Sequence, residues 1–157
     1  MYGYCESRGL FALSVGKTPV VSNLKKDSDI WTYDRFVIGQ VLGSSLETIK
    51  LETLEKWWKI FGPGDSSRRV SSGLAQLIIM RVYTEVVQPR PPGNLHVGQL
   101  VYTKVLPPVD QVMIGEVFCL DKRLKVDKKL IIFQVDVSDP KSLELLFQGK
   151  VTVFWSK

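Results

Sequence analysis

The sequence predicts an α+β fold in which an antiparallel sheet wraps around one long buried helix. The helix is the segment 71–87, whose apolar residues recur at helical spacing on nearly every side. Only Gln76, Arg81, Thr84 and Glu85 are clearly polar, and a helix that is apolar on nearly all sides is a buried helix. Almost everything after it reads as extended runs joined by short turns, which favours an antiparallel meander.

The first 35 residues form an N-terminal arm whose structure the sequence does not define, because glycines, a proline and a polar patch interrupt its short apolar pieces. The folded domain is expected to span residues 36–157. Residues 36–42 read as an extended segment broken at Gly39, and residues 44–50 alternate as a strand does.

Residues 51–61 switch to helical spacing. Thr53 is a possible N-cap, and Gly62, which begins a Gly-Pro-Gly turn, is expected to end the helix. Because one of two adjacent helical residues must face outward, the Trp57-Trp58 pair is expected to be half core and half partner surface. The packing face of this helix is formed by Leu51, Leu54, Trp58 and Phe61.

Four strands are expected after the central helix. The proline-rich loop 88–94 is a stiff, extended crossing into the first of them. The charged segment 121–127 reads as a hairpin bend, and 138–142 reads as a turn. The strands are expected at residues 95–106, 111–120, 129–137 and 143–155.

The chain has 157 residues, which suits one domain that buries roughly two-thirds of its surface. Its net charge of +5 is compatible with an anionic ligand such as a nucleotide or phosphopantetheine, or simply with solubility. The lysines are scattered rather than clustered with aromatic residues, so no nucleic-acid partner is expected. The central helix is too short and too charged to cross a membrane.

Two cysteines, Cys5 and Cys119, lie far apart without a CxxC spacing, and the chain has one histidine. These residues do not form a zinc site of the usual kind, so neither a metal nor another cofactor is expected. Two reduced thiols and the lack of a signal-peptide pattern indicate a cytoplasmic protein.

Four segments occur in an order that is more specific than any of them alone. They are 36–42 (FVIGQVL), 52–65 (ETLEKWWKIFGPGD), the helix 71–87 with Ser72-Gly73-Leu74 near its start, and the strands from residue 95 on, with Gly98-Gln99 in the first. In that order they resemble the opening strand, the short helix ending in Gly-Asp, the central helix and the closing strands of the MaoC-like, or R-specific enoyl-CoA hydratase, family. That family has the hot-dog fold.

The resemblance implies a dimer with a continuous sheet, and an acyl-CoA or acyl-carrier-protein thioester in a tunnel beside the helix. In the family an Asp and a His, in the motif Gly-Asp-x4-His, hydrate or dehydrate the 2,3 double bond. Two positioned acid/base groups are needed because a water must be activated and a proton placed on the α-carbon. Amides at the start of the helix polarise the thioester carbonyl.

This chain departs from the motif. Gly64-Asp65 matches its beginning, but Val70 occupies the position of the His, and the segment between Asp65 and Gly73 is far shorter than in the family. Such a chain is not expected to run the two-residue mechanism alone.

Asp65 and His96 are therefore the candidate catalytic residues. Asp65 is either a remaining base or nucleophile, or an acceptor for the amides of the turn after Gly64. His96 is the only histidine, so any imidazole chemistry must use it. The alternative for His96 is a packed strand histidine with one nitrogen satisfied.

Ser72 and Gly73 are the candidates for contacting the acyl thioester. Gly73 either presents its amide to the carbonyl or allows the helix and a strand to pack closely. Arg68 and Arg69 are candidates for binding the phosphates of CoA or of a phosphopantetheine arm; the alternative is a solvated loop.

The departures leave three functional hypotheses. The first is a hydratase or dehydratase of acyl thioesters that uses Asp65 or His96 in an altered site. The second is a non-catalytic hot-dog subunit that binds an acyl chain or completes a catalytic partner, as a homodimer or heterodimer. This second hypothesis, which resembles the mycobacterial heterodimeric dehydratases, is favoured by the missing segment. The third is a thioesterase that uses Asp65 with Gly73.

Overall fold

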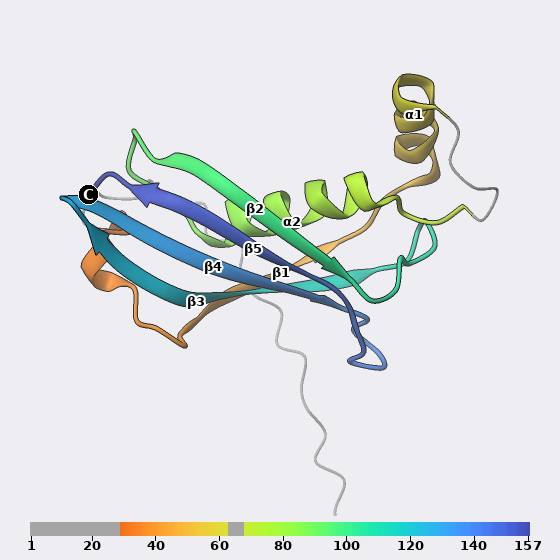
Figure 1. Cartoon of the computed structure of the whole chain (residues 1–157). Coiled ribbons are helices and arrows are strands. Elements are labelled where there is room, and N and C mark those ends of the chain that lie inside the picture. The colour runs from red at the N-terminus through yellow and green to blue at the C-terminus, as the bar shows by residue number, and fades with distance from the viewer. Residues whose placement is uncertain (1–28, 63–67) are drawn as a thin grey trace, which may run out of the picture.

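A five-stranded antiparallel sheet curls around the helix α2 in the computed structural model, which describes residues 29–62 and 68–157 (Figure 1). The strand order is β1-β3-β4-β5-β2, so β1 and β2 form the two edges. The predicted α+β fold with an antiparallel sheet is thus confirmed. The elements are a 3-10 helix at Tyr33–Arg35, β1 Val41–Glu47, α1 Leu51–Phe61, α2 Ser72–Val86, β2 Leu95–Thr103, β3 Met113–Lys125, β4 Lys128–Ser138 and β5 Leu145–Trp155.

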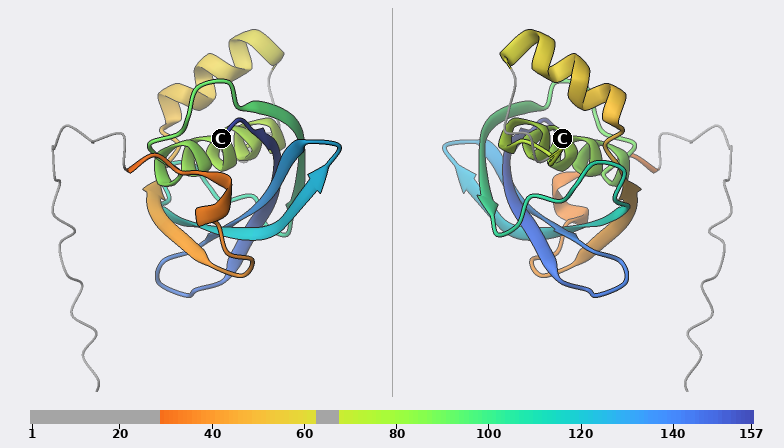
Figure 2. Two further views of the ribbon diagram at one scale, coloured as in Figure 1. Left: turned by 90° about the vertical axis from the view of Figure 1, so that its left-hand side faces the viewer. Right: turned by 90° about the vertical axis from the view of Figure 1, so that its right-hand side faces the viewer.

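Helix α2 contacts all five strands, and the end-on views show it lying inside the curl of the sheet (Figure 2). Two glycines allow this close approach. A Cβ at Gly149 would lie 2.5 Å from Ile79 Cγ2, and one at Gly115 would lie 2.5 Å from Val82 Cγ2. Because close-packed interiors leave no room for an added carbon, these two bare strand positions set the distance between helix and sheet.

The start of α2 is capped as its sequence predicts. Ser71 has an extended backbone, and its hydroxyl oxygen accepts a hydrogen bond from the Leu74 amide at 3.3 Å. By contrast, Thr53 does not cap α1, whose N-cap residue is Lys50 and has no side-chain cap. Gly62 ends α1 with a left-handed φ of 88°, as expected.

The strands differ from the expected ones mainly at β3, which continues to Lys125 through the charged segment predicted as a bend. Only Val126 and Asp127, both with left-handed φ, form the turn to β4. Charged side chains are tolerated there because this end of the hairpin is exposed on both faces. Near the start of the domain a single strand, β1, covers the end of the extended segment expected at 36–42 and the beginning of the one expected at 44–50. Its register shifts between Val41 and Gly43.

Residues 29–35 pack on the end of the sheet. The Trp31 ring stacks on Phe36 with centroids 4.8 Å apart, and the Trp155 indole donates a hydrogen bond to the Trp31 carbonyl at 2.8 Å. The rest of the predicted arm, including Cys5, lies outside the described residues; Cys119 is a buried free thiol. In the described part of the chain, no helix has the length and apolar character needed to cross a membrane.

Glu47, at the end of β1, is the one buried charged residue in the described part of the chain, and its side chain is 2% exposed. Its Oε2 atom lies 2.9 Å from Nη2 of Arg81 on α2, without the alignment of a hydrogen bond. Burial raises the pKa of the Glu47 carboxyl above its ordinary value, and the Arg81 guanidinium offsets this only in part. Ionisation of this carboxyl is therefore less favourable in the folded protein than in the unfolded chain.

Glu47→Gln is expected to flatten the pH dependence of stability. A carboxyl whose pKa is raised on folding binds its proton more tightly in the native state, so its contribution is present at acidic pH and is lost as the pH rises above about 4.5 and through the folded pKa. The glutamine variant has no carboxyl to titrate, so its stability does not fall in this way. Urea unfolding at a series of pH values measures the change of unfolding free energy with pH. The control is Glu116→Gln, because Glu116 is an exposed glutamate of β3. An unchanged slope in Glu47→Gln would contradict the assignment.

Candidate functional site

The family's catalytic position corresponds to the start of α2, which is held by the segment that follows β2. The Val70 amide donates to the Pro107 carbonyl at 2.9 Å, and the Val109 amide donates to the Arg68 carbonyl at 2.9 Å. Val70, where the family has its histidine, points an apolar side chain into the core and is 1% exposed. Asp65 lies outside the described residues.

Gly73, in the first turn of α2, is in direct contact with Trp57 of α1. A Cβ at Gly73 would lie 2.8 Å from Trp57 Cη2 and closer still to Cζ2. The Trp57 ring also packs on Phe61, with centroids 4.2 Å apart. The group packed against Gly73 is thus a tryptophan of another helix and not a strand.

The amides of Ser72 and Gly73 have no hydrogen-bond partner among the described residues, because Ser71 caps only Leu74. Free first-turn amides carry the positive end of the helix dipole. The indole of Trp57 lies beside them, in the space next to Gly73. A thioester carbonyl approaching from this side would meet an aromatic ring.

His96 lies far from this position. It is exposed at the beginning of β2, with Nε2 3.0 Å from the Gly98 carbonyl oxygen. Because the chain turns back between α2 and β2, the beginning of β2 lies next to the last turn of α2. The structure therefore does not bring His96 and Gly73 together.

Arg68 and Arg69 are both exposed and differ in their contacts. The Arg69 guanidinium donates to the Leu106 carbonyl at 2.6 Å, and its backbone forms a β-bridge with Pro108. Arg68 has a left-handed φ of 49°. The Arg69 side chain thus holds the loop after β2 in place.

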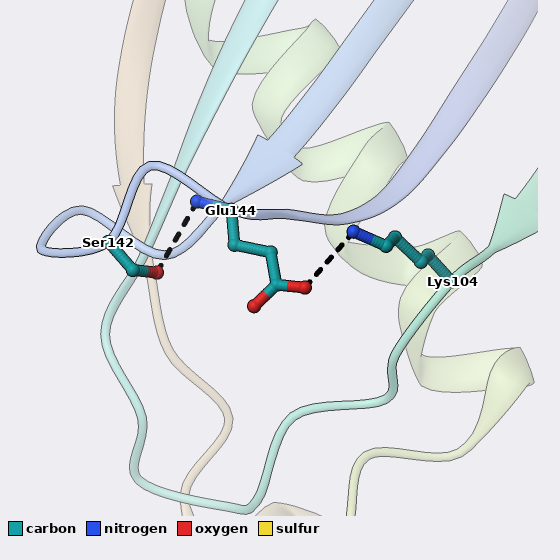
Figure 3. A network of polar contacts seen from close by, with 3 residues as sticks. All are labelled: Lys104, Ser142 and Glu144. Carbon is teal, nitrogen blue, oxygen red and sulfur yellow. Dashed lines mark hydrogen bonds and ion pairs between the residues drawn. The ribbon is translucent and has the colours of Figure 1, made fainter.

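A polar network at this end of the sheet also links two segments of the fold. Lys104 Nζ lies 3.0 Å from a Glu144 carboxylate oxygen, and the Glu144 amide donates to the Ser142 hydroxyl at 3.3 Å (Figure 3). The network joins the segment after β2 to the turn between β4 and β5. Both charged side chains are more than half exposed, so the pair contributes at most about 1 kcal/mol to stability.

No group of three or more histidine, cysteine, aspartate or glutamate side chains in the described ranges is placed to hold a metal ion. The contact that sequence reasoning missed is that of Trp57 with Gly73. Trp57 and Gly73 are 16 positions apart and on different helices, so only the fold reveals it; the one signal was a glycine in the first turn of an otherwise apolar helix.

Neither a protein-family model nor a curated protein matches the chain. Solved structures do. One is a MaoC-like dehydratase from Rhodospirillum rubrum, with a TM-score of 0.65 and 16% identity over 79% of this chain and 97% of that one. Another is the truncated HadBC (3R-hydroxyacyl-ACP dehydratase) complex from Mycobacterium tuberculosis, with a TM-score of 0.63 and 8% identity over 74% and 95%. A third is a Staphylococcus aureus protein in complex with CoA, with a TM-score of 0.55 and 9% identity over 75% and 71%.

At these identities the likeness establishes the architecture. The sheet order, the enclosed helix and the match to nearly the full length of two of these proteins agree. The chain has the hot-dog fold, in the form found in MaoC-like dehydratases and R-hydratases.

Proposed function

We propose that this chain is a hot-dog subunit that binds an acyl thioester together with a second hot-dog chain and leaves the acid/base chemistry to that partner. The observation that carries the proposal is the Trp57 indole packed on Gly73 at the start of α2. It fills the space in which a catalytic family member would place the thioester carbonyl.

The residues around this position support the same conclusion. Hydration of an enoyl thioester needs two acid/base groups within reach of the same two carbons. Val70 supplies an apolar, buried side chain in place of one of them. His96, the only imidazole in the chain, lies at the opposite end of α2. Even with Asp65 in place, the pair would be incomplete.

A partner would bind most favourably along β2. This edge strand has nine residues and no charged side chain, whereas natural edge strands are usually protected by charges. Leu100 and Tyr102 on it are 57% and 55% exposed, and Leu77 of α2 adds further exposed apolar surface. The HadBC complex is an assembly of hot-dog chains with dehydratase activity in its description, which fits a partner of this kind.

An acyl thioester is the ligand class that the fold and the charge both favour. The net charge of +5 suits the phosphates of CoA or of a phosphopantetheine arm. A protein of the same fold has been solved in complex with CoA. A neighbour of the same fold is a dehydratase of 3-hydroxyacyl thioesters on a carrier protein.

Purified alone, the chain is expected to hydrate crotonyl-CoA at least about a thousandfold more slowly than an intact MaoC-like hydratase. One positioned acid/base group contributes roughly a hundred- to ten-thousandfold, and the remaining group lacks its partner. The loss of the enoyl-thioester absorbance measures the rate, for the wild type, Asp65→Asn and His96→Ala.

Robust turnover that either substitution abolishes would overturn the non-catalytic role and assign the site to that residue. Activity that appears only when the chain is co-expressed with a hot-dog protein carrying Asp-x4-His would support the non-catalytic role. An inactive Asp-to-Asn variant of that partner is the matched control, because it keeps the assembly and removes the chemistry.

Gly73→Ala is expected to have opposite effects with and without the tryptophan. In the wild type the added methyl collides with Trp57, at a cost of about 1–3 kcal/mol of unfolding free energy. In a Trp57→Leu background the same change should stabilise by up to about 1 kcal/mol, since alanine is the better helix former. Urea unfolding of the wild type, Gly73→Ala, Trp57→Leu and the double variant gives the change in unfolding free energy in each background. Stabilisation in both backgrounds would contradict the Trp57–Gly73 contact.

The chain alone is expected to form a dimer along β2 at micromolar concentration. Leu100→Lys should shift it toward the monomer of 17.8 kDa, because a charge would be buried at the pairing edge. The matched control is Leu46→Lys, which places the same charge on the other edge strand, where Leu46 is 66% exposed. Light scattering measures the molecular mass of the wild type and of both variants. A monomeric wild type, or dimer loss only in Leu46→Lys, would exclude pairing along β2.

A further inference from the structure

Two cavities lie at the end of the sheet opposite to Gly73, where the loop after α2 meets the β3–β4 hairpin and the end of β5. One, of about 550 Å³, is formed by the loop and includes Arg90 and Asn94. The other, of about 510 Å³, lies between Leu95, Phe154 and the hairpin residue Lys128. Gly93 lines both, so the two cavities adjoin. The loop after α2 and the end of β5, which line them, lie near the end marked C in Figure 1.

The donors that line these cavities are held in place but not neutralised. The Arg90 guanidinium lies 5.3 Å from the centre of the Tyr83 ring, and the Lys128 ammonium lies 5.3 Å from the centre of the Phe154 ring. Within the described part of the chain, neither cation forms an ion pair. Aromatic faces orient a cation and leave its charge available for an anion.

Asn94 joins the loop after α2 to the residue that follows β5. Its Oδ1 atom accepts a hydrogen bond from the Ser156 amide at 2.9 Å, and the Ser156 hydroxyl donates to the Pro92 carbonyl at 2.6 Å. These bonds hold the wall of the cavity formed by the loop in a fixed position. The Asn94 amide nitrogen is buried, so it does not face a ligand in the open cavity.

We propose that these adjoining cavities bind the phosphate groups of a nucleotide, with Arg90 and Lys128 as the phosphate-binding groups. Among the described residues, Asp127 is the only carboxylate side chain that lines either cavity, against the three cations Arg90, Lys128 and Lys129. Leu95 and Phe154 supply an apolar wall for the base. Cavities of this size suit a ligand of nucleotide dimensions.

The location of this site would bring its ligand close to the partner chain, an argument that rests on the proposed function. Two chains paired antiparallel along β2 place the beginning of β2 in one beside the end of β2 in the other. The end of β2 lies by the start of α2, since Val70 binds the segment after β2. The nucleotide end of a CoA-type thioester bound here would thus lie near the start of α2 in the partner.

Adenosine 3′,5′-bisphosphate, titrated into the isolated chain by calorimetry at low salt, tests the site directly. One molecule per chain is expected to bind, and adenosine, which lacks phosphates, is expected to bind far more weakly. Arg90→Gln and Lys128→Gln should each weaken binding of the bisphosphate about tenfold or more, as loss of a charge-assisted contact does. The matched control is Lys104→Gln, an exposed lysine at the other end of the sheet, which should leave binding unchanged.

Lys128 is exposed on the hairpin, so its variant keeps the fold even if Arg90→Gln proves unstable. Absence of binding, equal binding of adenosine, or equal weakening by all three substitutions would overturn the site. Leu100→Lys separates this proposal from the proposed pairing, because all the binding groups come from one chain. Binding retained in a monomeric Leu100→Lys protein supports the site whatever the fate of the dimer, and binding lost only there would overturn the single-chain site.

Discussion

The close packing of α2 against the curled sheet is the constraint on which the rest of the molecule depends. It is possible because Gly115 and Gly149 have no side chain at the points where Val82 and Ile79 of α2 pack against the sheet. The helix is apolar on most sides, so its burial removes apolar surface from water and stabilises the fold. The position of α2 also determines where the segments at its two ends lie, and with them Gly73 and His96.

That arrangement explains why His96 and Gly73, two of the site residues predicted from the sequence, do not lie together. The chain leaves α2 through the loop 88–94 and returns along it as β2, so residues early in β2 lie beside the end of the helix. His96 is among them, while Ser72 and Gly73 occupy the start. In the family pattern the histidine precedes the helix; here that position is Val70, whose contribution is to the core.

The fold could be predicted from the sequence to a large extent, because apolar periodicity, glycines and prolines are local signals. Helix α1 was predicted to the residue, and the four later strands within a few positions, except that β3 runs on through Lys125. The candidate site could not be predicted in the same way. The contact of Trp57 with Gly73 and the burial of Glu47 against Arg81 both join residues from separate elements. No local pattern specifies such pairs; only the packing of α2 does.

The two ends of α2 therefore differ in a way that suits a partner subunit. At its start, the Trp57 ring occupies the space beside first-turn amides that have no partner among the described residues. At its other end, Arg90 and Lys128 line open cavities and form no ion pair in the described part of the chain. Under antiparallel pairing along β2, the open basic end of one chain adjoins the helix start of the other. A chain without chemistry of its own would then still determine which thioester its partner can hold.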